Sequence, residues 1–266
     1  MDLFLYFLQL IGYWLGVAAI CGLAVELLSR SFGFLIGRKA MLFFGVTSIV
    51  GTPVHELGHA IMCLLFTHQI TGIKLWDPTA KDGTYGYVEH SYSRKNLWAR
   101  IGNLPIGLGP LFSGLGVTVL VLWLCFPELW KDYLASSGEL IRAGRFSFGE
   151  LMKEIFSLFL GLPGAFRQHW VRSLIGTVIL LSVSLHVSLS WKDIQNGLSA
   201  LPIWLALIFL LALCTRYNAA GEKILRVSGL FAIRATSLFA LVIAFATVWV
   251  LTALLLRTVR AIIRLF

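Results

Sequence analysis

The sequence predicts an all-α polytopic membrane protein, and two observations lead to this class. The chain of 266 residues is 58% hydrophobic and only 13% charged, and its mean hydropathy is +0.83, which no ordinary soluble domain reaches. The apolar residues also fall into separate runs, several of which have the roughly 20 residues that a helix needs to cross a bilayer. We expect about six transmembrane helices, a small β-hairpin after the second, and an amphipathic surface helix between the third and fourth.

The expected spans divide the chain into three parts. Residues 1–39 hold a first span at about 3–28 and a basic turn, and this span is too long for a signal peptide. Residues 40–200 form the core, and residues 201–266 hold the C-terminal spans and a basic tail. The other five spans are expected at about 40–66, 99–126, 170–189, 201–215 and 229–256.

Two segments of the core do not have the composition of spans. Residues 69–95 alternate loosely in hydropathy around the turn signal Asp77-Pro78, which predicts a β-hairpin at the membrane surface. An extended substrate could add to the edge of this hairpin, although a purely connecting role fits equally well. Residues 127–169 carry many charges opposite apolar residues at helical spacing, which predicts an interfacial helix that serves as an anchor or a lid.

The charge pattern indicates what the surface contacts. The net charge of +9 arises from Lys and Arg that flank the apolar runs and do not cluster with aromatic residues. This arrangement is typical of loops beside a lipid bilayer and argues against nucleic-acid binding. The four cysteines show no disulfide spacing. We expect an integral, multi-pass protein of a cell membrane.

The clearest chemical motif is His55-Glu56-Leu57-Gly58-His59, inside the second apolar run. Helical positions four apart lie on one face, so His55 and His59 can both bind one metal ion. Glu56 can then act as a general base on a water held by that metal. Ionisable groups inside a membrane segment are costly and usually functional, so the motif predicts a metal site. Pro53 predicts a break or bend of the helix just ahead of the histidines.

A catalytic zinc ion usually has three protein ligands, and two residues far along the chain are candidates for the third. Asp193 is the favoured candidate, although an Asp there also suits a helix N-cap. His186 is the alternative, or a residue that orients the ligand from behind. Both lie where the fourth expected span ends.

We do not expect the remaining Cys and His residues named below to bind the metal. Cys63 continues the spacing of His55 and His59, but on one helix it lies too far from His55 to share an ion, so we expect it to pack in the core. We expect His68, His90 and His169 to lie at surfaces or in loops.

These features resemble the site-2 protease family of intramembrane zinc metalloproteases. The resemblance covers residues 40–200 and is carried by the histidine motif, the hairpin region after it, Gly109-Pro110-Leu111 and the distal Asp193. It implies that His55, His59 and Asp193 bind Zn²⁺, that Glu56 activates water, and that the substrate is a membrane protein or peptide.

Two departures from the family pattern mark the chain as a divergent member. The distal motif reads Lys192-Asp193-Ile194-Gln195-Asn196-Gly197, where the family has Asn-Pro-Asp-Gly or Leu-Asp-Gly. The family commonly has an asparagine after the Gly-Pro pair, whereas here Ser113 stands nearby. We therefore expect Asn103 to take the substrate-holding role, together with Gly109 and Pro110.

Other functions are compatible with parts of the pattern. The main alternative is a proteolytically inactive membrane scaffold or chaperone that binds metal, although such a site has no need of a base beside its ligands. A metal transporter or a desaturase needs more intramembrane histidines or acids than this chain offers.

Overall fold

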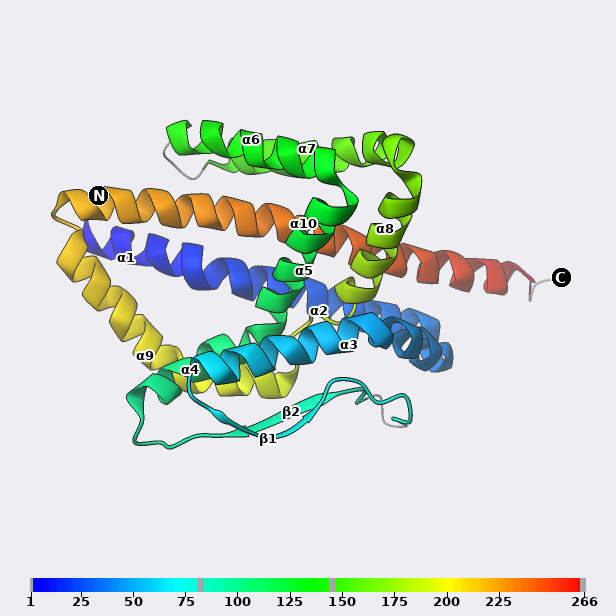
Figure 1. Ribbon diagram of the computed structural model, residues 1–266, viewed down its shortest axis with the longest axis horizontal. Helices are drawn as coiled ribbons and strands as arrows, with labels where there is room; N and C mark the ends of the chain where they lie inside the picture. Colours follow the sequence, from blue (N-terminus) through cyan, green and yellow to red (C-terminus); the bar gives the residue numbers. More distant parts are fainter. Residues whose placement is uncertain (1, 81–83, 144–146, 264–266) are drawn as a thin grey trace.

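The computed structural model describes residues 2–80, 84–143 and 147–263 and is built mainly of helices (Figure 1). Residues 81–83 of the expected hairpin region and 144–146 of the expected interfacial segment lie outside the described residues. The elements in chain order are α1 (Leu3–Ile11), η1 (Gly12–Gly16), α2 (Val17–Ile36), η2 (Gly37–Lys39), α3 (Ala40–Leu65), β1 (Gln69–Lys74), β2 (Tyr87–Ser91), α4 (Leu97–Gly107), α5 (Gly109–Cys125), α6 (Pro127–Ala143), α7 (Phe148–Gln168), α8 (Trp170–Ser184), α9 (Trp191–Thr215) and α10 (Ala219–Ile263).

Two long helical segments lie side by side at the centre of the arrangement, and the other helices form layers on either side of them. The continuous helix α1–η1–α2 runs side by side with α10 (Figure 1). On one side of this pair lie α3, α4 and the hairpin, and on the other side lie α6 and α7. Helix α5 runs from the first layer to the second and packs on α3 and α8. The helical fold with one small sheet is therefore as expected.

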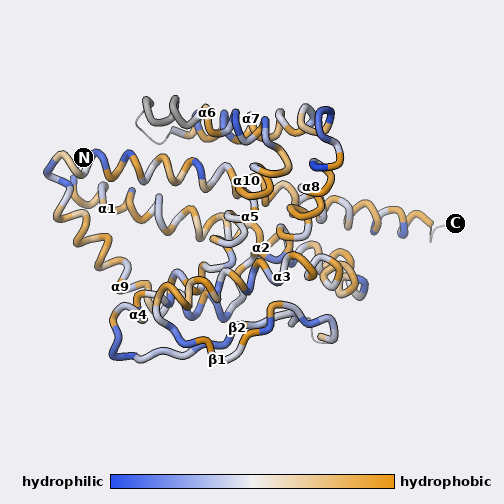
Figure 2. Tube along the Cα trace, in the orientation of Figure 1, coloured by the Kyte–Doolittle hydropathy of each residue, from blue (hydrophilic) through white to orange (hydrophobic). Residues whose placement is uncertain are grey.

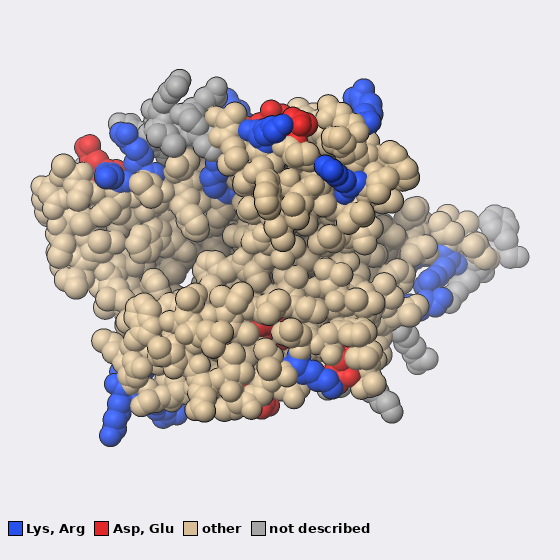
Figure 3. Space-filling view, in the orientation of Figure 1, with Lys and Arg blue, Asp and Glu red and all other residues tan. Residues whose placement is uncertain are grey.

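Four helices are long and apolar enough to cross a membrane among the residues that the structure describes. They are Leu3–Ile36, Ala40–Leu65, Trp191–Thr215 and Ala219–Arg260. The pair Leu97–Gly107 and Gly109–Cys125 forms a fifth candidate, bent by 58°, and Trp170–Ser184 is a shorter apolar helix. Apolar residues dominate these helices (Figure 2), and much of the face in Figure 3 is uncharged. These features indicate a membrane-embedded protein.

Several expected boundaries were wrong. The first span extends to Ile36, beyond its expected end at about residue 28. The fourth span ends at Ser184, before its expected end at about residue 189. Helix α9 is longer than the expected fifth span because it begins at Trp191, and Asp193 lies in its first turn. The interfacial segment forms two helices, α6 and α7, rather than one. The pattern of charged and apolar residues predicted a helical segment but did not show that it divides into two helices.

Helix α3 continues through Pro53, so the break that was one of the two expected outcomes there is absent. Proline removes one backbone donor from a helix interior, but the loss of this hydrogen bond does not end α3. The break lies instead between α4 and α5, where Leu108 separates Gly107 from Gly109 and Pro110 occupies the first turn of α5. Proline is preorganised for that position, because the first-turn N–H groups have no partner within the helix.

Glycines at the crossing of α3 and α5 allow the two backbones to touch. A Cβ atom on Gly58 would lie 2.3 Å from the Gly109 carbonyl oxygen, and one on Gly109 would lie 2.7 Å from the Gly58 backbone. No side chain fits in that space, and small residues at such a contact are typical of membrane helices. This contact holds α5 directly against the turn that carries His59.

The hairpin of β1 and β2 lies along α3 (Figure 1). The strands are antiparallel, with Ile70 opposite His90 and an irregularity before Gly72. Side chains fasten the hairpin to the helix: Trp76 Nε1 donates to Ser48 Oγ at 3.0 Å, and Tyr85 Oη donates to the Met41 carbonyl at 3.0 Å. The hairpin is therefore held over the face of α3 that carries Glu56.

A salt bridge stabilises the turn side of the hairpin. Lys74 Nζ lies 2.5 Å from Asp77 Oδ2, and Thr79 donates to the other carboxylate oxygen through its backbone N–H at 2.9 Å. The hydrogen bond from Lys74 and those from Thr79 lower the pKa of Asp77 to about 2. Asp77 is therefore ionised at neutral pH.

Candidate metal centre

Three side chains from two helices far apart in the sequence lie close together. His55 and His59 come from α3, and Asp193 comes from the first turn of α9. The Nε2 atoms of the two histidines lie 3.2 Å apart, and Asp193 Oδ1 lies 3.2 Å from His59 Nε2. Asp193 Oδ2 lies 3.9 Å from His55 Nε2. The three side chains are only 17%, 10% and 12% exposed.

Backbone carbonyls fix how the two imidazoles are protonated. His55 Nδ1 lies 2.6 Å from the His186 carbonyl oxygen, and His59 Nδ1 lies 2.8 Å from the Ile106 carbonyl oxygen. A carbonyl oxygen only accepts hydrogen bonds, so each Nδ1 must carry the proton and donate it. In the neutral rings, both Nε2 atoms then present lone pairs toward each other and toward the Asp193 carboxylate.

Such an arrangement suits a cation. Three atoms that can only accept repel one another unless a positive charge lies between them. A tetrahedral zinc ion with bonds of about 2.0–2.1 Å places its ligand atoms roughly 3.3 Å apart. The two 3.2 Å separations agree with this value, whereas the approach of Asp193 to His55 Nε2 is longer, at 3.9 Å. The carbonyl contacts behind the rings are those that orient metal-binding histidines in general. The residues therefore fit a metal ion.

Asp193 also completes the start of α9. Ser190 is the N-cap: its Oγ accepts from the Asp193 N–H at 3.2 Å, and Asp193 Oδ2 accepts from the Ser190 N–H at 2.7 Å. This reciprocal pair is a capping box, with Asp in the place of the usual Glu. The sequence suited Asp193 to a helix N-cap or to a metal ligand. Ser190 is the N-cap instead, and the Asp193 carboxylate both completes the capping box and faces the two histidines.

The His186 side chain does not join the group. Its Nε2 atom bonds Thr47 Oγ1 at 2.9 Å and its Nδ1 atom lies 3.5 Å from Thr52 Oγ1. The ring packs against the backbone at Gly51, where a Cβ atom would lie 2.4 Å from it. His186 therefore contacts the centre through its carbonyl oxygen, and the geometry favours Asp193 as the third ligand.

Glu56 lies beside the centre in a cavity of about 630 Å³. The cavity is lined by His55 and Glu56 of α3, by Tyr85 and Gly86 ahead of β2, and by the turn between α8 and α9. Glu56 itself is 7% exposed. Gly86 lies so close that a Cβ atom there would be 2.9 Å from Glu56 Cγ. A molecule in this cavity would reach both the carboxylate and the histidine.

A second cavity, of about 490 Å³, reaches the other side of Asp193. It lies between α2, α4 and α9, and its lining is Leu, Ile, Ala and Gly apart from Glu26 and Asp193. The candidate centre therefore stands between a polar cavity under the hairpin and an apolar cavity among the membrane helices.

The expected substrate-holding residues are packed into the fold. Asn103 is buried, and its Nδ2 donates to Tyr92 Oη at 2.8 Å and to Ser199 Oγ at 3.1 Å. Gly109 and Pro110 are buried at the contact between α3 and α5. None of the three lines either cavity, so their contacts explain the joining of helices rather than substrate binding.

The expectation for His68 was wrong, whereas Cys63 is buried in the core, as expected, and His90 is half-buried on β2. His68 is buried, and the ligand atoms of the three residues lie within 4.8 Å of one another, one turn along α3 from His59. Sequence reasoning treated them singly, although a closed hairpin brings the residue before β1 beside the end of β2. His169 is exposed, as expected.

Comparison with known proteins finds no matching family model, no matching curated protein and no matching solved structure.

Proposed function

We propose that the chain is an intramembrane zinc metalloprotease, a divergent relative of the site-2 protease family, that hydrolyses peptide bonds of membrane-embedded or membrane-proximal substrates. One observation carries the proposal. Three acceptor atoms of His55, His59 and Asp193 converge beside a buried carboxylate, Glu56, that faces the same cavity as His55.

The residues have distinct roles in this reaction. His55, His59 and Asp193 would hold the zinc ion, which lowers the pKa of a bound water toward about 7 and polarises the substrate carbonyl. Glu56 accepts the proton from the attacking water and returns it to the leaving amine, as a general base and then a general acid. The His186 and Ile106 carbonyls keep both imidazoles in the tautomer that binds metal.

The two cavities support a membrane substrate. The apolar cavity has the lining that an apolar stretch of a membrane polypeptide needs, and it ends at Asp193. The polar cavity, beside Glu56, can hold a segment whose backbone has left the helix. Such unwinding is required because helical carbonyls are otherwise engaged in internal hydrogen bonds.

The test compares Glu56→Gln with the wild-type protein, each purified in detergent and assayed for zinc and for cleavage of single-span peptides. We expect Glu56→Gln to keep its zinc and to lose cleavage by at least about a hundredfold, the usual contribution of a general base. The control is Glu89→Gln, which changes an exposed carboxylate on β2 and should leave both unchanged.

Two outcomes would count against the proposal. Full cleavage by Glu56→Gln removes the assigned base. Stoichiometric zinc in a wild-type protein that cleaves none of the peptides favours the alternative, a proteolytically inactive metal-binding scaffold or chaperone.

A further inference from the structure

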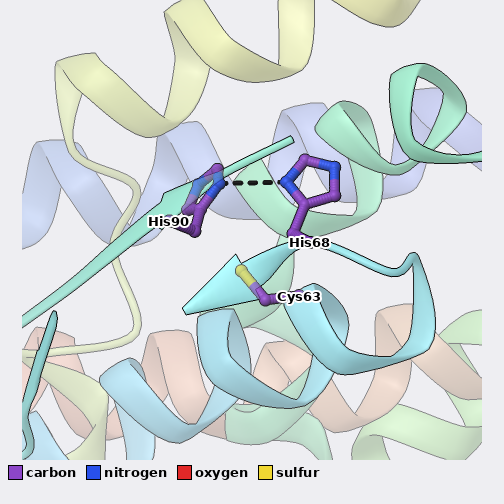
Figure 4. A group of neighbouring side chains, drawn as sticks. All are labelled: Cys63, His68 and His90. Carbon is purple, nitrogen blue, oxygen red and sulfur yellow. Dashed lines mark hydrogen bonds between the residues drawn. The ribbon is translucent and has the colours of Figure 1, made fainter. Parts of the chain in front are cut away.

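Cys63, His68 and His90 form a second cluster of metal-ligating side chains, distinct from the His55–His59–Asp193 group. His68 Nδ1 lies 3.0 Å from His90 Nδ1. Figure 4 shows the two rings meeting across this contact, with the sulfur of Cys63 on the same side of the hairpin. Cys63 is fully buried, His68 is 4% exposed, and His90 is half-buried.

The turn after α3 builds this cluster. His68 N–H donates to the Cys63 carbonyl at 2.8 Å and Thr67 N–H donates to the Leu64 carbonyl at 3.3 Å, which is the hydrogen-bond pattern of a Schellman motif. Thr67 has a φ of 57°, a left-handed conformation that is unfavourable for a β-branched residue. The strained turn brings His68 back beside the last turn of α3, next to Cys63.

The surroundings leave lone pairs facing the space between the three side chains. His68 Nε2 lies 2.8 Å from the Ala99 carbonyl oxygen, so this nitrogen carries the proton and His68 Nδ1 is an acceptor. The 3.0 Å contact with His90 Nδ1 is close to the roughly 3.3 Å separation of two imidazole ligands on tetrahedral zinc. A thiolate and two imidazoles form a donor set that prefers Zn²⁺ over Mg²⁺ or Ca²⁺.

We propose that Cys63, His68 and His90 bind a second ion of the zinc type that joins the hairpin to α3. Its ligands come from the last turn of α3, from the residue just before β1 and from the end of β2. The second nitrogen of His68 is fixed by the Ala99 carbonyl of α4. The segment just before β2 contributes Tyr85 and Gly86 to the cavity beside Glu56. This ion therefore has a positioning role for the hairpin and no contact with the reacting atoms.

The alternative is a metal-free pair in which His90 Nδ1 donates a hydrogen bond to His68 Nδ1 beside a protonated thiol. Cobalt separates the two readings, because a thiolate bound to Co²⁺ gives an intense near-ultraviolet charge-transfer band that a His–His–Asp site cannot give. The purified full-length protein is loaded with Co²⁺ and its spectrum and metal content are measured.

We expect the wild-type protein to bind two ions and to show the thiolate band. Cys63→Ala should lose the band and one of the two ions, and the control Cys21→Ala, which removes another buried thiol, should keep both. His90→Gln, at a half-buried position, should also lose the band. Asp193→Ala should lose one ion and keep the band. The band therefore reports on the Cys63–His68–His90 site independently of the proposed catalytic centre and of any cleavage.

Absence of the band from the loaded wild-type protein, or its persistence in Cys63→Ala, would overturn the proposal in favour of the metal-free pair. If Cys63→Ala does not fold, His90→Gln decides: retention of the band and of both ions contradicts the assignment.

Discussion

His59 Nε2 lies 3.2 Å from Asp193 Oδ1, although the two residues belong to helices at opposite ends of the core region. The same carboxylate accepts from the Ser190 N–H at 2.7 Å and so fixes the start of α9. One side chain thereby ties the position of α9 to the face of α3 that carries both histidines. A loss of the metal and a loss of the cap can be told apart by mutation.

Asp193→Ala should lose the metal from this centre while the protein stays folded. The substitution removes the third donor, and it also removes half of the capping box, which costs about 1 kcal/mol. Metal analysis and thermal unfolding in detergent measure the two effects. Ser190→Ala is the matched control, because it loses the other half of the box and should show a similar loss of stability with the metal retained. Full metal occupancy of this centre in Asp193→Ala would exclude Asp193 as a ligand.

His186→Gln should keep the metal at the same centre. The His186 imidazole bonds Thr47 at 2.9 Å, whereas His55 is oriented by the main-chain carbonyl, which the substitution leaves in place. We expect a loss of roughly 0.5–1.5 kcal/mol in the free energy of unfolding, the usual contribution of one hydrogen bond. If metal content falls as far as in Asp193→Ala, the third-ligand role passes to His186.

The sequence predicted the part of the site that lies on one helix. It did not predict the positions of residues that depend on the path of a turn. His55 and His59 face the same way because helical geometry requires it. The orientation of His186 depends on the short turn between Ser184 and Trp191, whose path no periodicity reports. The Cys63–His68–His90 group depends on a left-handed Thr67, a conformation that sequence rules assign to Gly or Asn.

Gly58→Ala should separate α3 from α5 and weaken metal binding at the adjacent His59. The new Cβ atom would lie 2.3 Å from the Gly109 carbonyl oxygen, and overpacking of this kind typically costs about 1–3 kcal/mol. Gly116→Ala is the control on α5, because among the described residues no atom beyond the adjoining helix backbone lies within 4 Å of the position of its Cβ. That change should be neutral or stabilise by up to about 1 kcal/mol, because alanine favours a helix over glycine. Equal unfolding temperatures for the two variants would show that the close contact does not constrain the helices.

Glu154→Ala should strongly lower the free energy of unfolding, because it removes a buried carboxylate of α7. Glu154 Oε2 lies 2.9 Å from Arg234 Nη1 of α10, with side chains only 5% and 15% exposed. Breaking a buried pair by removing one partner costs about 3–5 kcal/mol. We expect the lower end of this range, because Arg234 keeps the Tyr133 carbonyl at 2.6 Å and the Tyr133 ring at 4.1 Å.

The exposed pair of Glu128 and Lys131 on α6 provides the comparison. Its atoms approach to 3.1 Å, but its side chains are 51% and 71% exposed, so Glu128→Ala should change stability by about 0–1 kcal/mol. Thermal unfolding in detergent measures both variants under the same conditions. Because Glu154 joins α7 to α10 and lies in neither cavity, its loss should leave metal content unchanged below the unfolding temperature. A Glu154→Ala protein as stable as Glu128→Ala would mean that the pair does not hold α7 against α10.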